Sequence, residues 1–291
     1  MRFSLEAAMG PIFVLIWSTG FIIARLSMPY VEPATFLLWR FMGVLLAMGI
    51  LSLIWRPVWP KWPLAGHIGV AGALLQFGYL LGVWCAVRFG MSAGLAALIV
   101  GLQPILTAWW SAWVAEHVTQ RQWLGLALGF IGVAFVVFEK THFVQLPLAS
   151  YLLIIGALLS ITLGTLYQKK FCANFDLRAG SLIQFAVAVV LTAITVALFE
   201  TGKMVWNWPV VIALGWSIGP LSIGSVSLLF LLIRKGAATR VTSLLYLTPP
   251  TTAVMAWIGF HEPLTALMIF GILLTMVGVL IVNHKAQVSL P

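Results

Sequence analysis

Polar side chains that could bind a small molecule stand at helical spacing inside long apolar stretches of the sequence. Gln76 and Tyr79 are three residues apart, so an amide and a phenol share one face of a helix. Trp17 and Thr19 lie near the middle of another stretch. Such groups could hydrogen-bond a zwitterionic solute in a cavity, with the aromatic ring as apolar surface. The alternative is hydrogen bonding between helices, worth about 1 kcal/mol in a membrane.

Prolines mark two further stretches. Pro104 lies within one of them, and Pro249 with Pro250 lies within the other. A proline inside a helix removes a backbone donor and crowds the carbonyl four residues earlier. Interrupted helices at matching positions of two halves indicate a binding site, so the neighbouring Gln103 and Tyr246 join the candidates. A kink that serves packing alone is the alternative, because membrane helices tolerate proline.

Arg40 is the one basic residue inside an apolar stretch. An ionisable group at membrane depth is a functional candidate because burying its charge is costly. We favour a structural anchor that snorkels or bonds to neighbouring helix ends, and binding of a substrate carboxylate is the alternative. Trp84, near the end of its stretch, is expected in the aromatic belt at the membrane interface.

These residues require elements that cross a bilayer, and the composition provides little else. The 291 residues are 62% hydrophobic and 8% charged, whereas soluble domains carry roughly a quarter charged residues. A helix needs about 20 apolar residues to cross the hydrocarbon core, so we expect an all-α integral membrane protein with ten spans. The spans are predicted at residues 8–27, 34–55, 65–87, 92–114, 122–139, 149–169, 180–200, 209–233, 239–258 and 265–283.

The basic residues of the connectors predict the orientation, because cytoplasmic loops carry the excess of Lys and Arg. Connectors alternate between the two sides of the membrane. One side holds eleven basic residues: Arg2, Arg56, Lys61, Arg121, Lys169, Lys170, Arg178, Arg234, Lys235, Arg240 and Lys285. The other side holds four: Arg25, Arg88, Lys140 and Lys203. Both termini are therefore expected in the cytoplasm.

The sequence repeats itself at a shift of 146 positions. The shift pairs Arg88 with Arg234, Gly90 with Gly236, Pro104 with Pro250, Glu116 with Glu262, Gly125 with Gly271, and Gly132 with Gly278. It also pairs Thr19 with Thr165 and Gln76 with Ser222, which adds Thr165 and Ser222 to the candidates. Packing is the commoner role of such small hydroxyl residues. We predict two five-helix repeats, residues 1–145 and 146–291.

Five spans per repeat have a topological consequence. Because five is odd, the second repeat must enter the bilayer from the opposite side, which gives inverted repeats related by a two-fold axis in the membrane plane. Binding sites in such proteins lie near the midplane at the repeat interface. The two halves can then open a central site to either side in turn.

Catalytic and cofactor chemistry are not indicated by the sequence. No nucleophile, base or metal-ligand constellation gathers at one membrane depth, so no catalytic residue, metal ligand or cofactor is predicted. Cys85 and Cys172 lack partners at metal-ligand spacing. The net charge of +9 comes from scattered basic residues, which argues against a nucleic-acid partner. The expected partners are a small-molecule substrate and the lipid bilayer. The sequence is compatible with a monomer and does not fix the oligomeric state.

Several segments resemble the EamA-type branch of the drug/metabolite transporter superfamily. They are FVLIWSTGFIIARLSM, MSAGLAALIVGLQPILTAWWSAWVAEHVTQRQWLGLALGFIGVAFV and GAATRVTSLLYLTPPTTAVMAWIGFHEPLTALMIFGILLTMVGVLIV. The resemblance implies a ten-helix fold in a bacterial-type inner membrane and transport of small metabolites, commonly export of amino acids. The alternatives are multidrug efflux of lipophilic cations and metabolite uptake. No acidic residue lies in the middle of a span, which disfavours cation efflux.

Overall fold

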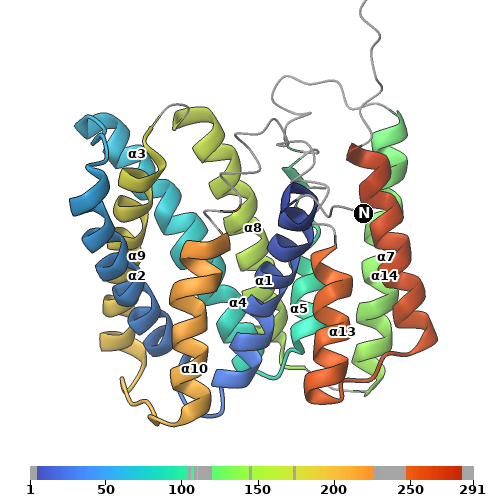
Figure 1. The fold of residues 1–291 in the computed structure, drawn as a ribbon. Coiled ribbons are helices and arrows are strands. Elements are labelled where there is room, and N and C mark those ends of the chain that lie inside the picture. The colour runs from blue at the N-terminus through green and yellow to red at the C-terminus, as the bar shows by residue number, and fades with distance from the viewer. Residues whose placement is uncertain are drawn as a thin grey trace, which may run out of the picture.

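Helices account for nearly all of the part of the chain that the computed structural model describes, residues 5–103, 106–107, 110, 120–143, 146–172, 175–225, 228 and 247–283. Each of the ten predicted spans contains a described helix (Figure 1). The first repeat contributes α1 (Leu5–Ser27), α2 (Pro33–Trp55), α3 (Trp62–Gly72), η1 (Ala73–Gly78), α4 (Tyr79–Arg88), α5 (Ala93–Val100) and α7 (Gln120–Phe143). The second contributes α8 (Leu148–Phe171), α9 (Leu177–Phe199), α10 (Trp208–Trp216), η2 (Ser217–Gly224), α13 (Thr248–Phe260) and α14 (Ala266–Asn283).

Five of the described helical segments are long and apolar enough to cross a membrane by themselves. They are Met9–Ser27, Pro33–Ile54, Trp62–Arg88, Leu148–Phe171 and Leu177–Phe199. The third of these joins α3, η1 and α4 into one span. The chain is a multi-pass membrane protein, and its many exposed leucine, isoleucine and phenylalanine side chains are the surface that lipid covers.

Helix ends follow from local sequence. Ser92 caps α5 by accepting a hydrogen bond from the amide of Leu95 at 3.3 Å, and Asn207 caps α10 through the amide of Val210 at 3.0 Å. Pro33 stands at the start of α2, where its missing N–H costs nothing. These residues fix where the spans begin, which sets the depth of the side chains within them.

The two repeats are inverted. At one end of the bundle, the carbonyl of Met28, just after α1, accepts a hydrogen bond from Arg88 Nη1 at 2.7 Å. At the same end, the hydroxyl of Ser150, near the start of α8, donates to the carbonyl of Ala86 at 2.9 Å. The first helix of one repeat therefore ends where the first helix of the other begins, so α1 and α8 run in opposite directions (Figure 1).

Helices α2 and α9 pack antiparallel and are tied at both ends. The carboxylate of Glu200, after α9, accepts hydrogen bonds from the amides of Ala34 and Thr35 at 2.8 and 2.7 Å, at the start of α2. At the opposite end, the carboxylate of Asp176, before α9, accepts from the amide of Val58 at 3.1 Å, after α2. A helix N-terminus carries unpaired amides and a partial positive charge, so each carboxylate also stabilises the helix N-terminus that it caps.

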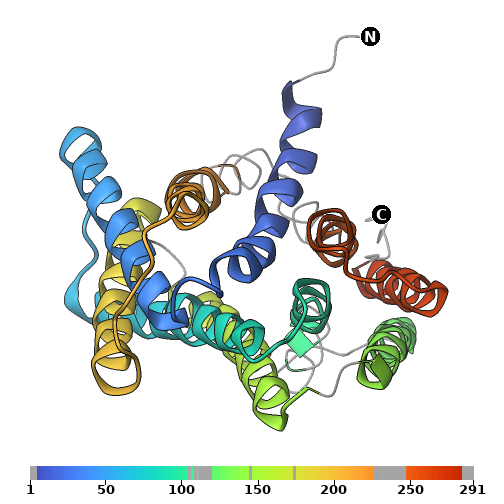
Figure 2. The same cartoon turned by 90° about the horizontal axis from the view of Figure 1, so that it is seen from below.

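Glycines bring α7 and α14 together at the far edge of the bundle (Figure 2). A Cβ at Gly132 would lie 2.5 Å from the carbonyl oxygen of Gly271, and one at Gly278 would lie 2.5 Å from that of Gly125. Each of these positions is the 146-shift counterpart of another, so the crossing is itself two-fold symmetric. Small residues at membrane helix interfaces permit this backbone approach.

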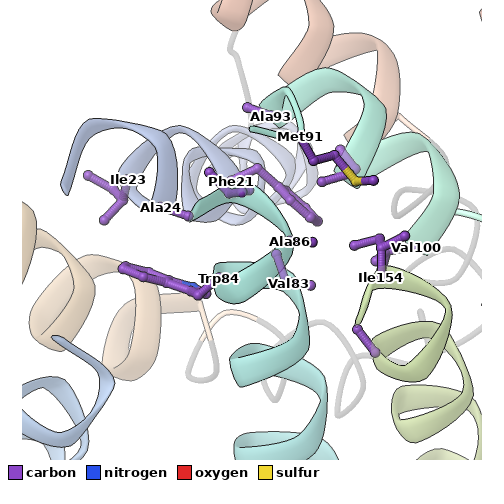
Figure 3. Close-up of a cluster of buried hydrophobic side chains, with 14 of the residues drawn as sticks. Phe21, Ile23, Ala24, Val83, Trp84, Ala86, Met91, Ala93, Val100 and Ile154 are labelled. Atoms are coloured by element: carbon purple, nitrogen blue, oxygen red, sulfur yellow. The ribbon is translucent and has the colours of Figure 1, made fainter. Parts of the chain in front are cut away.

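The buried core lies where α1, α4, α5 and α8 converge (Figure 3). Trp84 is 1% exposed and its ring stacks on Phe36 at 4.4 Å between centroids. Its predicted place in the interfacial belt is therefore wrong: the indole packs inward, because stacking on another ring inside the bundle buries more of its apolar surface than the interface would.

Candidate functional site

Two π-helical segments interrupt the third and eighth spans at equivalent places. The segment η1 ends at Gly78 and η2 ends at Gly224, which is the 146-shift counterpart of Gly78. In η2, Pro220 lacks the N–H of a regular helix. In η1, the hydroxyl of Ser160 on α8 donates to the carbonyl of Leu74 at 2.8 Å. Such segments occur frequently at functional sites, because they re-aim side chains and free backbone groups.

The helix breaks predicted at the prolines do not coincide with the π segments. Pro249 and Pro250 lie in the first turn of α13, where the missing N–H groups would be unpaired in any helix. Pro104 and Tyr246 lie outside the described residues. Pro220, which sequence reasoning passed over, was the signal for η2, whereas η1 depends on a contact with another helix that no local pattern announces.

Arg40, Ser222 and Tyr79 come together between α2 and the two interrupted spans. Arg40 is 6% exposed, and its Nε and Nη2 donate to Ser222 Oγ at 3.3 and 3.1 Å. Ser222 Oγ in turn donates to the carbonyl of Ser217 at 2.7 Å, within η2. Tyr79 is 7% exposed and directly follows η1, at the start of α4, which packs on α2. Two predicted site residues from different repeats thus lie around one buried cation.

Gln103 and Thr165, both predicted, contact each other. Gln103 Nε2 donates to Thr165 Oγ1 at 3.0 Å, which joins the fourth span to the sixth. The Thr165 hydroxyl donates to the carbonyl of Ile161 on its own helix at 2.7 Å. The amide of Gln103 and the hydroxyl of Thr165 are both half-buried, so they are shielded from lipid without being sealed inside the core.

Thr19, the symmetry counterpart of Thr165, has the same pattern of bonds. Its hydroxyl donates to the carbonyl of Ile16 at 2.5 Å and accepts from Trp216 Nε1 at 2.8 Å. Trp17 is not part of this contact: it packs on Phe13 with ring centroids 5.6 Å apart. The structure therefore brings Thr19 to the eighth span and leaves Trp17 on a different side of α1.

Gln76 is half-buried within η1, and its side chain makes no hydrogen bond to any described residue. The predicted common face with Tyr79 assumed a regular helix. In a π segment the hydrogen bond runs over five residues, so positions three apart are rotated relative to a regular helix. Tyr79 accordingly points into the buried core, whereas Gln76 is more exposed.

Further polar contacts lie where α8 meets α3 and α9, and sequence reasoning did not assemble them. Gln184 Nε2 donates to Gln168 Oε1 at 2.8 Å. His67 Nδ1 and the hydroxyl of Tyr167 lie 2.8 Å apart, and the His67 ring stacks on Phe171 at 5.0 Å between centroids. The partners lie on different helices, so the packing of α8 against α3 and α9 brings them together.

Three of these hydrogen bonds both cross between the repeats and end on a hydroxyl that is itself a donor. The bonds Gln103–Thr165, Trp216–Thr19 and Arg40–Ser222 each join a residue before position 146 to a residue after it. In each, the accepting hydroxyl also donates to a carbonyl of its own helix. The site thus offers hydroxyl and amide groups and one positive charge along the interface between the repeats.

Known proteins match the chain over most of its length. The EamA-like transporter family matches residues 6–138 and 148–284. The uncharacterized transporter YvbV of Bacillus subtilis is 28% identical, over 94% of this chain and 90% of that protein. A probable amino-acid metabolite efflux pump of Salmonella typhimurium is 24% identical, over 95% of this chain and 96% of that protein. One solved crystal structure has the same fold, with a TM-score of 0.68 and 18% identity over 96% of each chain.

Proposed function

Because the chain belongs to the EamA-like transporter family, a family of transporters rather than enzymes, we propose that it exports amino acids or related small metabolites from the cell. The observation that carries the proposal is the group of three bonds Gln103–Thr165, Trp216–Thr19 and Arg40–Ser222, which are among the hydrogen bonds that cross between the repeats. Groups able to bind both ends of a zwitterion lie at this interface, and binding sites of inverted-repeat transporters lie there as well. A relative of similar length is named a probable amino-acid metabolite efflux pump, which agrees with this substrate class.

The mechanism follows from those bonds. In the proposed rocking of residues 1–145 against residues 146–291, we infer that Gln103–Thr165, Trp216–Thr19 and Arg40–Ser222 are bonds that break, since each has one partner in each repeat. A substrate that supplies replacement donors and acceptors lowers the cost of breaking them, since an unpaired buried polar group costs about 1–3 kcal/mol. Substrate binding and repeat motion are thereby coupled.

Within this proposal, the substrate-binding residues are Trp17, Thr19, Gln76, Tyr79, Gln103, Thr165, Ser222 and Tyr246. The predicted helix break at Pro104 is part of the proposal, and Pro249 and Pro250 stand at the start of α13. The protein resides in a bacterial-type inner membrane with both termini in the cytoplasm, as the excess of basic connectors on that side indicates. The substrate therefore leaves from the side where α2 begins.

The test is counterflow of labelled amino acids in liposomes that contain the purified protein. We predict saturable exchange that falls about tenfold in Thr165→Val, because this variant leaves Gln103 without its acceptor. The matched control is Thr195→Val, since the Thr195 hydroxyl bonds only to the carbonyl of Leu191 on its own helix among the described contacts. Exchange of lipophilic cations without exchange of amino acids would replace the proposed substrate class with that of multidrug efflux.

A further inference from the structure

Arg40 is a buried cation whose charge has no described counterpart. It lies seven residues into α2, about 10 Å from the start of the span at 1.5 Å per residue. Its side chain does not reach back to the interface: the guanidinium turns inward to η2, and the residue is 6% exposed. No carboxylate of the described residues lies within ion-pair distance of it. Burying an unpaired charge in this way is costly.

The hydrogen bonds of Arg40 use little of what a guanidinium offers. Nε and Nη2 both point at one oxygen, Ser222 Oγ, at 3.3 and 3.1 Å. A guanidinium has five N–H donors in a planar fork, which matches the two oxygens of a carboxylate. One neutral hydroxyl oxygen shared by two N–H groups leaves the other donors of the guanidinium unused and does not neutralise its positive charge.

The surroundings suit a carboxylate. The Ser222 hydroxyl lies against the guanidinium and can turn from the Ser217 carbonyl to donate to an anion. Tyr79 is a buried phenol at the start of α4, which packs on α2, and both residues adjoin or belong to a π segment. These segments place a group from each repeat at one point. An anchor for helix ends would be expected to meet backbone carbonyls, whereas every hydrogen bond described for Arg40 goes to a side chain of the other repeat.

We propose that Arg40, with Ser222 and Tyr79, binds the carboxylate of the transported molecule. This inference rests on the proposed function and names the chemical group that the site selects. The carboxylate takes the place of Ser222 Oγ on the guanidinium, which releases the bond between α2 of the first repeat and η2 of the second. The carboxamide and the decarboxylated amine of the same amino acid lack the negative charge that makes this replacement favourable.

The experiment measures preference for acid over amide in counterflow, with each amino acid competed against its carboxamide and its decarboxylated amine. Wild-type protein is expected to prefer the acid, and Arg40→Gln to lose about 10- to 100-fold of that preference, as expected for one charge-assisted hydrogen-bonded pair. Arg40→Lys keeps the charge without the fork and is expected to lie between them. Thermal denaturation of each variant in detergent reports whether it folds.

Two further variants keep the test decisive if Arg40→Gln does not fold. Ser222→Ala and Tyr79→Phe leave Arg40 in place and remove one hydroxyl each, and both are expected to reduce the acid preference. If amino acids exchange but the preference is unchanged in every folded variant, the carboxylate site is overturned while the proposed function stands. If only ligands without a carboxylate exchange in wild-type protein, both proposals fall. If other carboxylates exchange and amino acids do not, the Arg40 site stands and the substrate class changes.

Discussion

Single hydroxyl groups connect the two halves of this protein. Thr19, Thr165 and Ser222 each donate to their own helix and accept from a side chain across the repeat boundary. All three could be predicted, because small hydroxyl residues at symmetric positions stand out in an apolar sequence. Two of their partners could not be predicted. By residue type alone, Arg40 could equally be a structural anchor and Trp216 could equally belong to an interfacial belt, and only the packing of the helices decides between these roles.

Asp176 is a residue outside the spans whose protonation affects the fold. The hydrogen bond from the Arg178 side chain, at 2.8 Å from Nη2, is the main cause that lowers the pKa of Asp176 to about 2 from its ordinary 3.8. The backbone amides of Arg178 and Val58 and the charge of Arg178 act in the same direction, and partial burial opposes them. The ionised carboxylate is therefore the form that caps α9 and holds the connector after α2.

A pH-dependent loss of stability follows from this pKa. Because the folded-state pKa lies below the ordinary value, the contribution is complete above about pH 4 and is lost as the pH falls toward 2. We predict that Asp176→Asn slightly lowers the melting temperature in detergent at pH 7, since Arg178 is exposed and the pair is screened. The gap to wild type should close between pH 4 and pH 2, and a gap that stayed constant would contradict the assignment.

At the scale of elements, the sequence predicted where spans lie better than how they are bent. Apolar length and flanking charge place the ends of the five long described helical segments within several residues, because the bilayer imposes the length. The π segments were not predicted. In η1 the wider π turn coincides with the hydrogen bond from the Ser160 hydroxyl to the Leu74 carbonyl and with the close approach of Gly78 to Ser160, and both contacts come from α8.

The glycine crossing of α7 and α14 gives an element-scale prediction. Gly132→Ala should lower the free energy of unfolding by about 1–3 kcal/mol, because the added Cβ meets the backbone of α14, which cannot move aside as a side chain could. Gly156→Ala, on α8, is the matched control, since its Cβ would meet nothing within 4 Å. The control should be neutral or up to about 1 kcal/mol more stable, as expected for alanine in a helix.

Denaturation of both variants in the same detergent checks this prediction. Equal stabilities would mean that α7 and α14 separate enough to admit a methyl group. The crossing would then contribute less than its geometry indicates, and lipid would fill the space between the helices.

At the scale of the whole molecule, the 146-position shift was the most informative property of the sequence. It predicted inverted repeats from an odd number of spans, and the antiparallel pairs α2 with α9 and α7 with α14 follow that symmetry. The contacts at the two ends of α2 and α9 were not predictable, because Glu200 and Asp176 lie far in sequence from the amides that they bind.

The orientation of the molecule in the membrane is a whole-molecule prediction. With eleven basic connector residues on one side and four on the other, a green fluorescent protein fused after Pro291 should fluoresce in cells. Alkaline phosphatase fused after Lys203 should be active, because that connector is expected outside. The same two fusions would show the opposite activities if the molecule were inserted the other way round.

The contact of Glu200 with the start of α2 also affects the order of events during synthesis. Ala34 and the carboxylate that binds its amide are 166 residues apart. At about 5–20 residues per second, the ribosome needs roughly 8 to 33 seconds to make the intervening chain. Throughout that interval the first amides of α2 lack the Glu200 carboxylate. Lipid headgroups, water or the insertion machinery must therefore supply their hydrogen-bond acceptors until the second half has been made.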